Sequence, residues 1–311
     1  MKKILRLGTR GSPLALIQAD EVKRRLLTPH ENPDLDIEIV PIKTTGDWKP
    51  GHSESRLIDF GGNKDLFTKE IEEALCAGHV DMAVHSMKDV AGRLPDGLMV
   101  GALLKRLDPR DAFIGRDAQT LDALLPGTSI GTSSLRRQAQ ILARRSDLRV
   151  VPLRGNVDTR LRKLKEGMAD ATILAVAGLE RLGATAHISS IMDTELMLPA
   201  AAQGAIGVEI RRDDAFMQKL LQPLNDRETS ICVGAERALL QALDGSCQTP
   251  VGALARLTGV QEMVLEGLVA KPDGTSLIRL QQSGATKDFE AIGTELGLRL
   301  KDRMPAGFFT A

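Results

Sequence analysis

The basic residues between positions 131 and 165 are the first feature of this chain that could do chemistry. Ten Lys and Arg side chains stand there against two acidic ones, in a chain of 41 basic and 41 acidic residues with no net formal charge. Such a local excess of positive charge attracts ligands that carry several negative groups. The stretch therefore predicts a site for a polyanion.

Helix positions divide these basic residues into two sets. A cation in the first turn of a helix opposes the positive end of the helix dipole, and a bound anion would remove that conflict. We predict that four side chains at expected helix starts face such an anion: Arg136, Arg137, Arg154 and Arg160. Four others are predicted to form the solvated faces of two helices: Arg144, Arg145, Arg162 and Lys163.

A carboxylate follows the apolar strand predicted over Val80–His85. Asp89 comes directly after Lys88 there, and a partly desolvated carboxylate at a strand end can act as an acid, a base or a stabiliser of positive charge. The alternative is a solvated loop residue paired with Lys88. His85 is expected to be a hydrogen-bonded structural residue, and without HxH or HExxH patterns no metal site is expected.

The three cysteines are widely spaced and odd in number, so no disulfide framework is expected. Cys247 lies in the polar turn DGSCQTP, where a thiol is exposed unless it serves as a nucleophile, a metal ligand or a covalent anchor. Cys76 and Cys232 stand beside Ala and Val in predicted helices. We therefore predict that both of these are core residues.

Composition excludes several classes of protein. With 311 residues, 42% hydrophobic and 26% charged, the chain is expected to be a soluble globular protein of two or three domains. Seven Phe, one Trp and no Tyr leave almost no platform for stacking nucleic-acid bases. Arg6 and Arg10 interrupt the apolar N-terminus, which argues against a signal peptide and for a cytoplasmic protein. No segment predicts a membrane span.

Predicted strands and helices alternate through the first two thirds of the chain. This pattern favours mainly parallel sheets, whose ligands bind at the carboxyl ends of the strands. Segments 104–111 and 198–207 look like two crossings between α/β lobes, and the polar, glycine-rich stretch 46–62 looks like a lid or a disordered loop. After about residue 227 a long helix, short strands and a final helix predict an α+β domain.

Several segments together resemble the porphobilinogen deaminase (hydroxymethylbilane synthase) family. The segments VHSMKDV (84–90), GTSSLRRQ (131–138), LRGNV (153–157) and GSCQTP (245–250) occur in the family's order, and TRGSPLA (9–15) also fits. The resemblance covers the chain from about residue 4 to its end. It implies two periplasmic-binding-protein-like α/β lobes, formed by residues 1–104 with 200–224 and by 105–199, and a smaller α+β domain over 225–311.

The same resemblance implies an activity and its residues. A family member is a transferase that joins four porphobilinogen molecules onto a dipyrromethane cofactor, losing ammonia at each step, and then releases hydroxymethylbilane by hydrolysis. Asp89 is implied as the catalytic carboxylate and Cys247 as the cofactor's thioether anchor. The other implied cofactor contacts are Ser86, Lys88, Thr132, Ser133, Ser134, Arg136, Arg137 and Arg160. The implied contacts of substrate and growing chain are Arg10, Ser12, Lys64, Arg154, Gly155, Asn156 and Arg181.

One segment departs from the family pattern. Residues 62–67 read GNKDLF where bacterial members read closer to GGKGLF, so Asp65 adds a negative charge beside Lys64. This leaves open the role of Lys64 and the behaviour of the stretch 46–62.

Other functions remain to be weighed against this one. A two-lobed solute-binding protein would also gather arginines in a cleft between lobes, but it has no use for Cys247. A phosphate-handling transferase would suit an anion site, yet the chain has no Walker-type glycine-rich loop. Nucleic-acid binding conflicts with the neutral charge and the scarcity of aromatic residues. By resemblance the protein is expected to be a monomer that acts on a small molecule.

Overall fold

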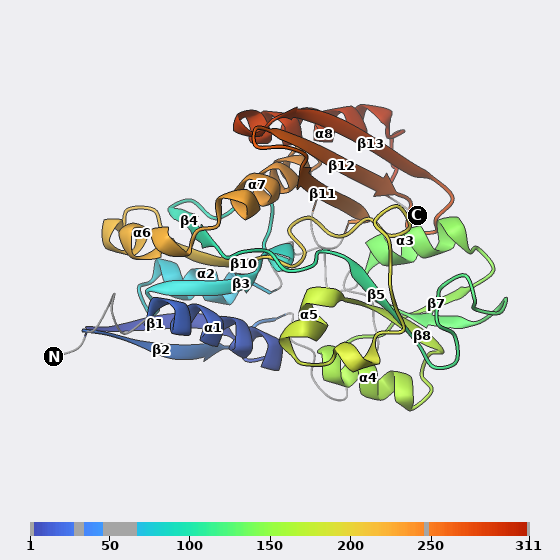
Figure 1. The fold of residues 1–311 in the computed structure, drawn as a ribbon, viewed down its shortest axis with the longest axis horizontal. Helices are drawn as coiled ribbons and strands as arrows, with labels where there is room; N and C mark the ends of the chain where they lie inside the picture. The colour runs from blue at the N-terminus through green and yellow to red at the C-terminus, as the bar shows by residue number, and fades with distance from the viewer. Residues whose placement is uncertain (1–2, 28–33, 46–66, 246–248, 310–311) are drawn as a thin grey trace.

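The computed structural model describes residues 3–27, 34–45, 67–245 and 249–309. Figure 1 shows two α/β units lying side by side and a third unit, orange to red, stacked across them. The expected stretch 46–62, Lys64 and Cys247 lie outside the described residues.

The first unit is built on a five-stranded sheet of order β2-β1-β3-β10-β4. β1 runs parallel to β2 and to β3, whereas β10 runs antiparallel to β3 and to β4. The antiparallel strand arises because β10 returns from the second unit. The bounds are β1 (Lys3–Arg10), α1 (Pro13–Leu26), β2 (Leu35–Ile42), α2 (Lys69–Cys76), β3 (Met82–Ser86), the 3-10 turn η2 (Met87–Asp89), β4 (Leu98–Leu103), β10 (Ile206–Arg211), α6 (Ala215–Leu221) and η4 (Gln222–Leu224).

The second unit has the same design, with a sheet of order β7-β6-β8-β5-β9. β6 is parallel to β7 and β8, while β5 is antiparallel to β8 and β9. Each sheet is thus mainly parallel, as expected, and its single antiparallel strand, β10 or β5, is the one at which the chain enters from the other unit. The bounds are β5 (Asp111–Gly115), β6 (Ser129–Gly131), α3 (Leu135–Arg144), β7 (Arg149–Val151), α4 (Val157–Lys165), β8 (Ala171–Ala175), α5 (Val176–Arg181), η3 (Thr185–His187) and β9 (Ser190–Ile191).

Two segments connect these units, as the sequence predicts. The first crossing, residues 104–110, runs from β4 to β5, and the second crossing, residues 192–205, runs from β9 to β10. The two crossings are in close contact at Gly204, which has φ +93°. A Cβ at this position would lie 2.7 Å from the carbonyl oxygen of Leu107. Only glycine fits this approach.

The third unit is the expected α+β unit. Its strands β11, β12 and β13 form an antiparallel meander, and α7 packs against α8 through close backbone contact at Gly293, whose Cβ would meet the carbonyl oxygen of Ala235 at 2.2 Å. The bounds are α7 (Arg227–Ala242), β11 (Val251–Leu257), β12 (Glu262–Ala270), β13 (Leu277–Ala285), η5 (Thr286–Asp288) and α8 (Phe289–Arg303).

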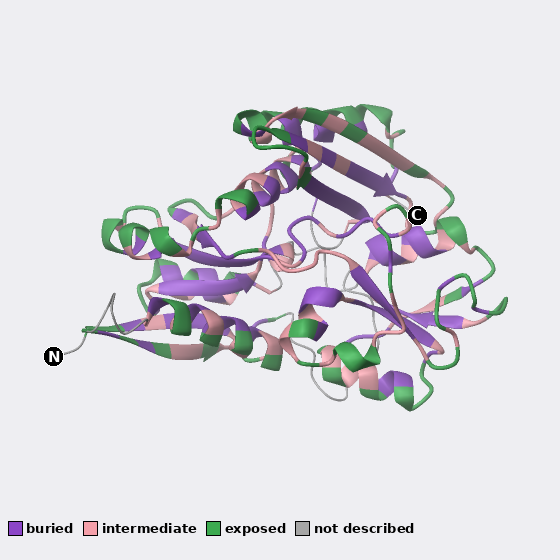
Figure 2. Ribbon diagram, in the orientation of Figure 1, coloured by how far each residue is buried: buried purple, intermediate pink, exposed green. Residues whose placement is uncertain are grey.

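Each unit has its own aliphatic core. Leu7, Met82 and Val208 lie fully buried in the first, and Figure 2 shows burial concentrated in the strands while the outer faces of the helices are exposed. Cys232 is buried as predicted, but Cys76 is exposed, so its assignment to the core is wrong. The buried face of α2 passes through Ile71 and Leu75, and the next residue along a helix points about 100° away from that face.

Candidate active site

The turn after β3 separates a buried residue from two polar ones. Met87 is buried against Gly207, where a Cβ would lie 2.1 Å from the Met87 sulfur. The next two residues, Lys88 and Asp89, are half-buried at the end of the strand. His85 is buried and its Nε2 lies 3.0 Å from Oε2 of Glu209 on β10, which agrees with the expected structural role. The packing of β3 against β10 therefore positions Asp89.

A small cavity of about 60 Å³ lies beside this turn and is lined by Arg10, Ser12, Leu14, Ala15, Gln18, Phe67, Thr68, Val84, His85, Ser86 and Asp89. Four of the predicted site residues thus meet there. The end of β1 supplies Arg10, whose guanidinium lies over the Phe67 ring at 4.5 Å. Ser12 caps α1, its Oγ accepting from the Ala15 amide at 3.3 Å ahead of Pro13.

Arg136 and Arg137 begin α3 and are both buried. Arg136 Nη2 donates to Oδ2 of Asp111 at 2.8 Å, and Arg137 Nη2 donates to Oδ1 of the same carboxylate at 2.7 Å. Burial works to raise the pKa of Asp111, but the two guanidinium groups outweigh it and hold that pKa well below its ordinary value. Asp111 thus supplies part of the negative charge that the sequence predicts beside these helix starts.

Lys88 connects the first unit to this cluster. Burial lowers its pKa to about 8, opposed by the neighbouring carboxylate of Asp89, and the charges of Asp111, Arg136 and Arg137 also act on it. The end of β3 therefore faces the start of α3 across the two units. Three cations meet two carboxylates there, which leaves the local field positive.

Several buried donors in this cluster have no partner among the residues that the structure describes. They are the Nε atoms of Arg136 and Arg137 and the hydroxyl of Ser133. Buried polar groups in proteins are nearly always hydrogen-bonded, so such a set points to a ligand that accepts hydrogen bonds. The donors present therefore fit an organic anion with carboxylate groups, such as a dipyrromethane carrying acidic side chains.

Two neighbouring hydroxyls help to shape the turn before α3. Thr132 Oγ1 accepts from the Ser134 amide at 3.2 Å, and Ser134 Oγ accepts from the Arg137 amide as the helix cap. Both lie beside Ser133, where the sequence predicts the cofactor contacts.

The polar segment 154–160 follows β7 and includes the start of α4. Asn156 caps α4 by accepting from the Thr159 amide at 2.9 Å, and Arg160 Nε donates to the Gly155 carbonyl at 2.8 Å. Gly155 has φ +115°, and a Cβ there would lie 2.6 Å from the Thr159 side chain, so glycine is required. Arg154 is buried, and its carbonyl accepts from Lys163 Nζ at 3.0 Å.

The predicted solvated faces are confirmed for two residues and wrong for two. Arg144 and Arg162 are half-exposed and pair with Asp122 and Glu166. Lys163 is instead buried because its amine reaches the chain before α4. Arg145 has only 17% of its side chain exposed because it donates to carbonyls of the 121–124 turn.

Arg181 lies at a contact between the two α/β units. Its Nη2 donates to the Gly204 carbonyl at 3.2 Å, and its Nε lies 3.7 Å from Oε2 of Glu21 on α1. The side chain is 7% exposed, and burial lowers its pKa. It does not belong to the lining of the small cavity.

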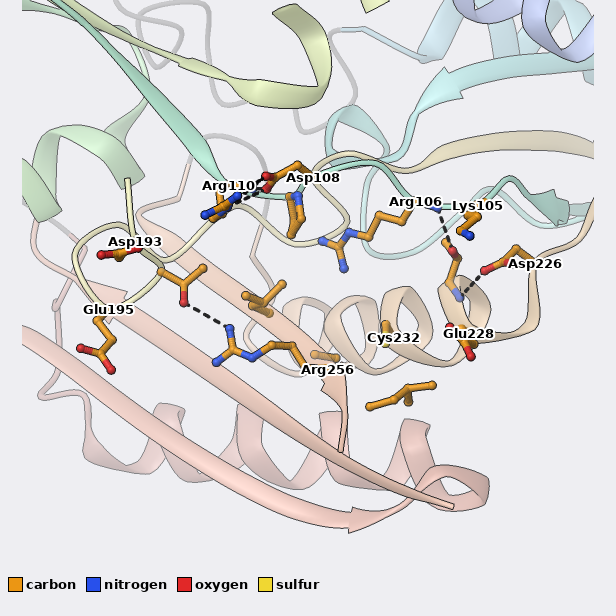
Figure 3. A pocket seen from close by; sticks show the side chains of 16 residues that line it. Lys105, Arg106, Asp108, Arg110, Asp193, Glu195, Asp226, Glu228, Cys232 and Arg256 are labelled. Atoms are coloured by element: carbon orange, nitrogen blue, oxygen red, sulfur yellow. Dashed lines mark hydrogen bonds and ion pairs between the residues drawn. The ribbon is translucent and has the colours of Figure 1, made fainter. Parts of the chain in front are cut away.

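A larger cavity of about 860 Å³ lies elsewhere, where the crossings meet the third unit (Figure 3). Arg106, Asp108 and Arg110 line it from above, Asp226 and Glu228 from the start of α7, and Arg256 from β11, as the figure shows. None of the predicted site residues within the described chain lines it. Beside it, Arg106 donates to both carboxylate oxygens of the buried Glu236 at 2.6 and 3.1 Å.

Sequence reasoning missed Asp111, Gln18 and Glu236. A charged residue directly before the apolar run Ala112–Ile114 was a usable signal for Asp111, because a carboxylate at the start of a buried strand needs a partner. Gln18, whose amide nitrogen lies 2.9 Å from Ser86 Oγ, and Glu236 give no comparable local signal.

The fold and the site together define a two-lobed α/β protein whose facing strand ends gather cationic donors suited to an organic polyanion. Two family models match: "Porphobilinogen deaminase, dipyromethane cofactor binding domain" over residues 5–219 and "Porphobilinogen deaminase, C-terminal domain" over residues 230–302. The chain belongs to the porphobilinogen deaminase family.

Two similar proteins carry the name of this family. The porphobilinogen deaminase of Nitrobacter winogradskyi is 48% identical over 304 residues, covering 98% of this chain and 95% of that protein. The porphobilinogen deaminase of Paracoccus denitrificans is 48% identical over 305 residues, covering 98% and 96%. Among solved structures, the methionine-binding protein MetQ has a TM-score of 0.45 at 14% identity, covering 73% of this chain and 91% of that one. No helix in the described part of the chain is long and apolar enough to span a membrane.

Proposed function

We propose that this protein is a hydroxymethylbilane synthase, a transferase that joins four porphobilinogen molecules with loss of ammonia and releases the linear product by hydrolysis. The observation that carries this proposal is the set of buried donors on Arg136, Arg137 and Ser133 at the start of α3, together with the ammonium of Lys88, on which the charges of both arginines act. Each pyrrole unit carries an acetate and a propionate, so a growing chain needs many cationic contacts.

We propose that the dipyrromethane cofactor is attached to Cys247 and held by Lys88, Ser133, Arg136 and Arg137. Ser86, Thr132, Ser134 and Arg160 complete the proposed set. When bound, the cofactor supplies the pyrrole carbon that receives the first substrate unit. The protein contributes fixed positive charge, and its buried donors bind carboxylates without reorganisation because Asp111 already orients two of them.

Asp89 is the proposed catalytic residue. Its half-buried carboxylate lines the same cavity as Arg10 and Ser12, and it makes no hydrogen bond with another described residue. A carboxylate there stabilises the positive charge that develops on a pyrrole nitrogen as ammonia leaves. One such group serves every cycle if the growing chain moves past it.

The proposed substrate contacts are Arg10 and Ser12 at the cavity, together with Lys64, Arg154, Gly155, Asn156 and Arg181. Arg10 supports this role most directly, because it lines the cavity and its guanidinium lies over the Phe67 ring. We also propose a cytoplasmic monomer with domains over 1–104 with 200–224, 105–199 and 225–311.

The intact mass of the purified protein tests this function. We expect an excess equal to two linked pyrrole units, absent from Cys247→Ser, together with ammonia release from porphobilinogen by the wild type. A fully active wild-type protein of unmodified mass would contradict the cofactor assignment. A protein that binds porphobilinogen without releasing ammonia would instead be a two-lobed solute-binding protein.

A further inference from the structure

Asp111 occupies an unusual position among the cations of the site. It is the first residue of β5, is fully buried, and receives hydrogen bonds from Arg136, Arg137 and Gln203. A carboxylate removed from water is stable only with such complete partnering. The three donors come from α3 and from the second crossing, so one anion joins the start of a helix to both segments that connect the lobes.

Each arginine donates a hydrogen bond to Asp111 through only one of its guanidinium nitrogens. Arg136 uses Nη2 for Asp111 at 2.8 Å and Nη1 for the Leu198 carbonyl at 2.7 Å, while Arg137 uses Nη2 for Asp111 at 2.7 Å. The Nε atoms of both stay buried without a partner in the described chain. Asp111 therefore fixes the two guanidinium groups relative to each other and still leaves donors for a second anion.

Gln203 ties this arrangement to the crossings. Its Nε2 donates to Oδ1 of Asp111 at 2.9 Å and to the Pro109 carbonyl at 2.7 Å. It stands between Ala202, whose φ of +61° is rare for a residue with a side chain, and Gly204 at +93°. Backbone held in such conformations persists only where surrounding contacts determine it.

We propose that Asp111 is a positioning residue for cofactor uptake: it holds Arg136 and Arg137 in the arrangement that receives the carboxylates of the dipyrromethane. This inference rests on the proposed function. Without the carboxylate, two buried guanidinium groups near Lys88 repel each other and lose their common acceptor. The competing view is that Asp111 merely occupies donors that the cofactor would otherwise use, in which case its removal speeds uptake.

The test follows uptake on cofactor-free protein. Wild type and Asp111→Asn, prepared in cells that make no porphobilinogen, are incubated with porphobilinogen, and mass spectrometry follows the gain of two pyrrole units. We expect Asp111→Asn to load on the order of 10- to 100-fold more slowly, because two charge-assisted hydrogen bonds are weakened. Loading at the wild-type rate or faster overturns the proposal. A wild type that never gains mass refutes the proposed function itself.

Two control variants separate positioning from stability. Asp122→Asn breaks a half-exposed pair with Arg144 on the same lobe and should load like the wild type. Met263→Ala removes a fully buried side chain from the core of the third unit, so it lowers stability outside the site and should load normally per folded molecule. If Asp111→Asn and Met263→Ala slow loading alike, in proportion to their loss of stability, the positioning role is refuted.

If Asp111→Asn fails to fold, a second variant at the site tests the positioning role of Asp111. Gln203→Leu keeps both ion pairs but removes the contact between Asp111 and the second crossing. We expect loading to slow severalfold, since one hydrogen bond to a charged group is lost. Loading at the wild-type rate in a folded Gln203→Leu protein would overturn the proposal.

Discussion

Glu236 is the carboxylate whose removal should most weaken the joint between the three units. It lies on α7, is fully buried, and accepts four hydrogen bonds: two from Arg106 on the first crossing, one from the Ala202 amide at 2.6 Å on the second, and one from the Ala255 amide at 2.8 Å on β11. Glu236→Gln keeps the shape of the side chain but replaces one carboxylate oxygen with an NH2 group. This NH2 group then faces N–H donors and can accept from none of them.

The expected cost follows from these contacts. Arg106 is 11% exposed, so it cannot recover its lost counter-charge from water, and breaking one partner of a buried ion pair costs about 3–5 kcal/mol. In the glutamine variant only one side-chain oxygen remains to accept hydrogen bonds, and the NH2 group cannot accept. One of the two backbone amides, of Ala202 or Ala255, therefore loses its acceptor. We therefore expect a fall of about 3–5 kcal/mol in the free energy of unfolding.

Urea denaturation followed by circular dichroism measures this change. The matched control is Glu166→Gln, which breaks a half-exposed pair with Arg162 on α4 and should cost about 1 kcal/mol or less. Equal midpoints for Glu236→Gln and Glu166→Gln would refute the reasoning, because they would mean that the buried carboxylate contributes no more than a solvated one.

Three further predictions concern the site. Asp89→Asn should keep the cofactor mass but lose turnover on the order of 100-fold or more, since the amide preserves shape and not charge; normal turnover removes Asp89 from its role. Lys88 has a pKa lowered to about 8, so its ammonium is present below that pH and lost above it. Cofactor uptake should therefore slow as the pH rises from 7 to about 9, and Lys88→Met should flatten this dependence; an unchanged profile contradicts the assignment. Gly155→Ala should lower the free energy of unfolding by about 1–3 kcal/mol, because φ is +115° and the Cβ meets Thr159, whereas Gly183→Ala, at φ +65° in open space, should cost less; equal denaturation midpoints would contradict this.

Local structure in this protein was largely predictable from the sequence. Ser12 followed by Pro13 is a typical helix start, and α1 begins there; the two crossings follow from where the alternating pattern is interrupted. Such features depend on neighbours within a few residues, through capping hydrogen bonds and the restricted φ of proline. The motif segments also sufficed to recognise the family.

Tertiary structure decided which charges meet. Asp111 is 25 residues from Arg136 and 92 from Gln203, and Glu236 is 130 from Arg106, so no local pattern connects these partners. The burial of Lys163 and the exposure of Cys76 depend in the same way on which face of a helix another element covers. Sequence periodicity predicts that a helix has a buried face, but only the packed fold determines which distant group supplies the counter-charge, because ion pairing acts through space and not along the chain.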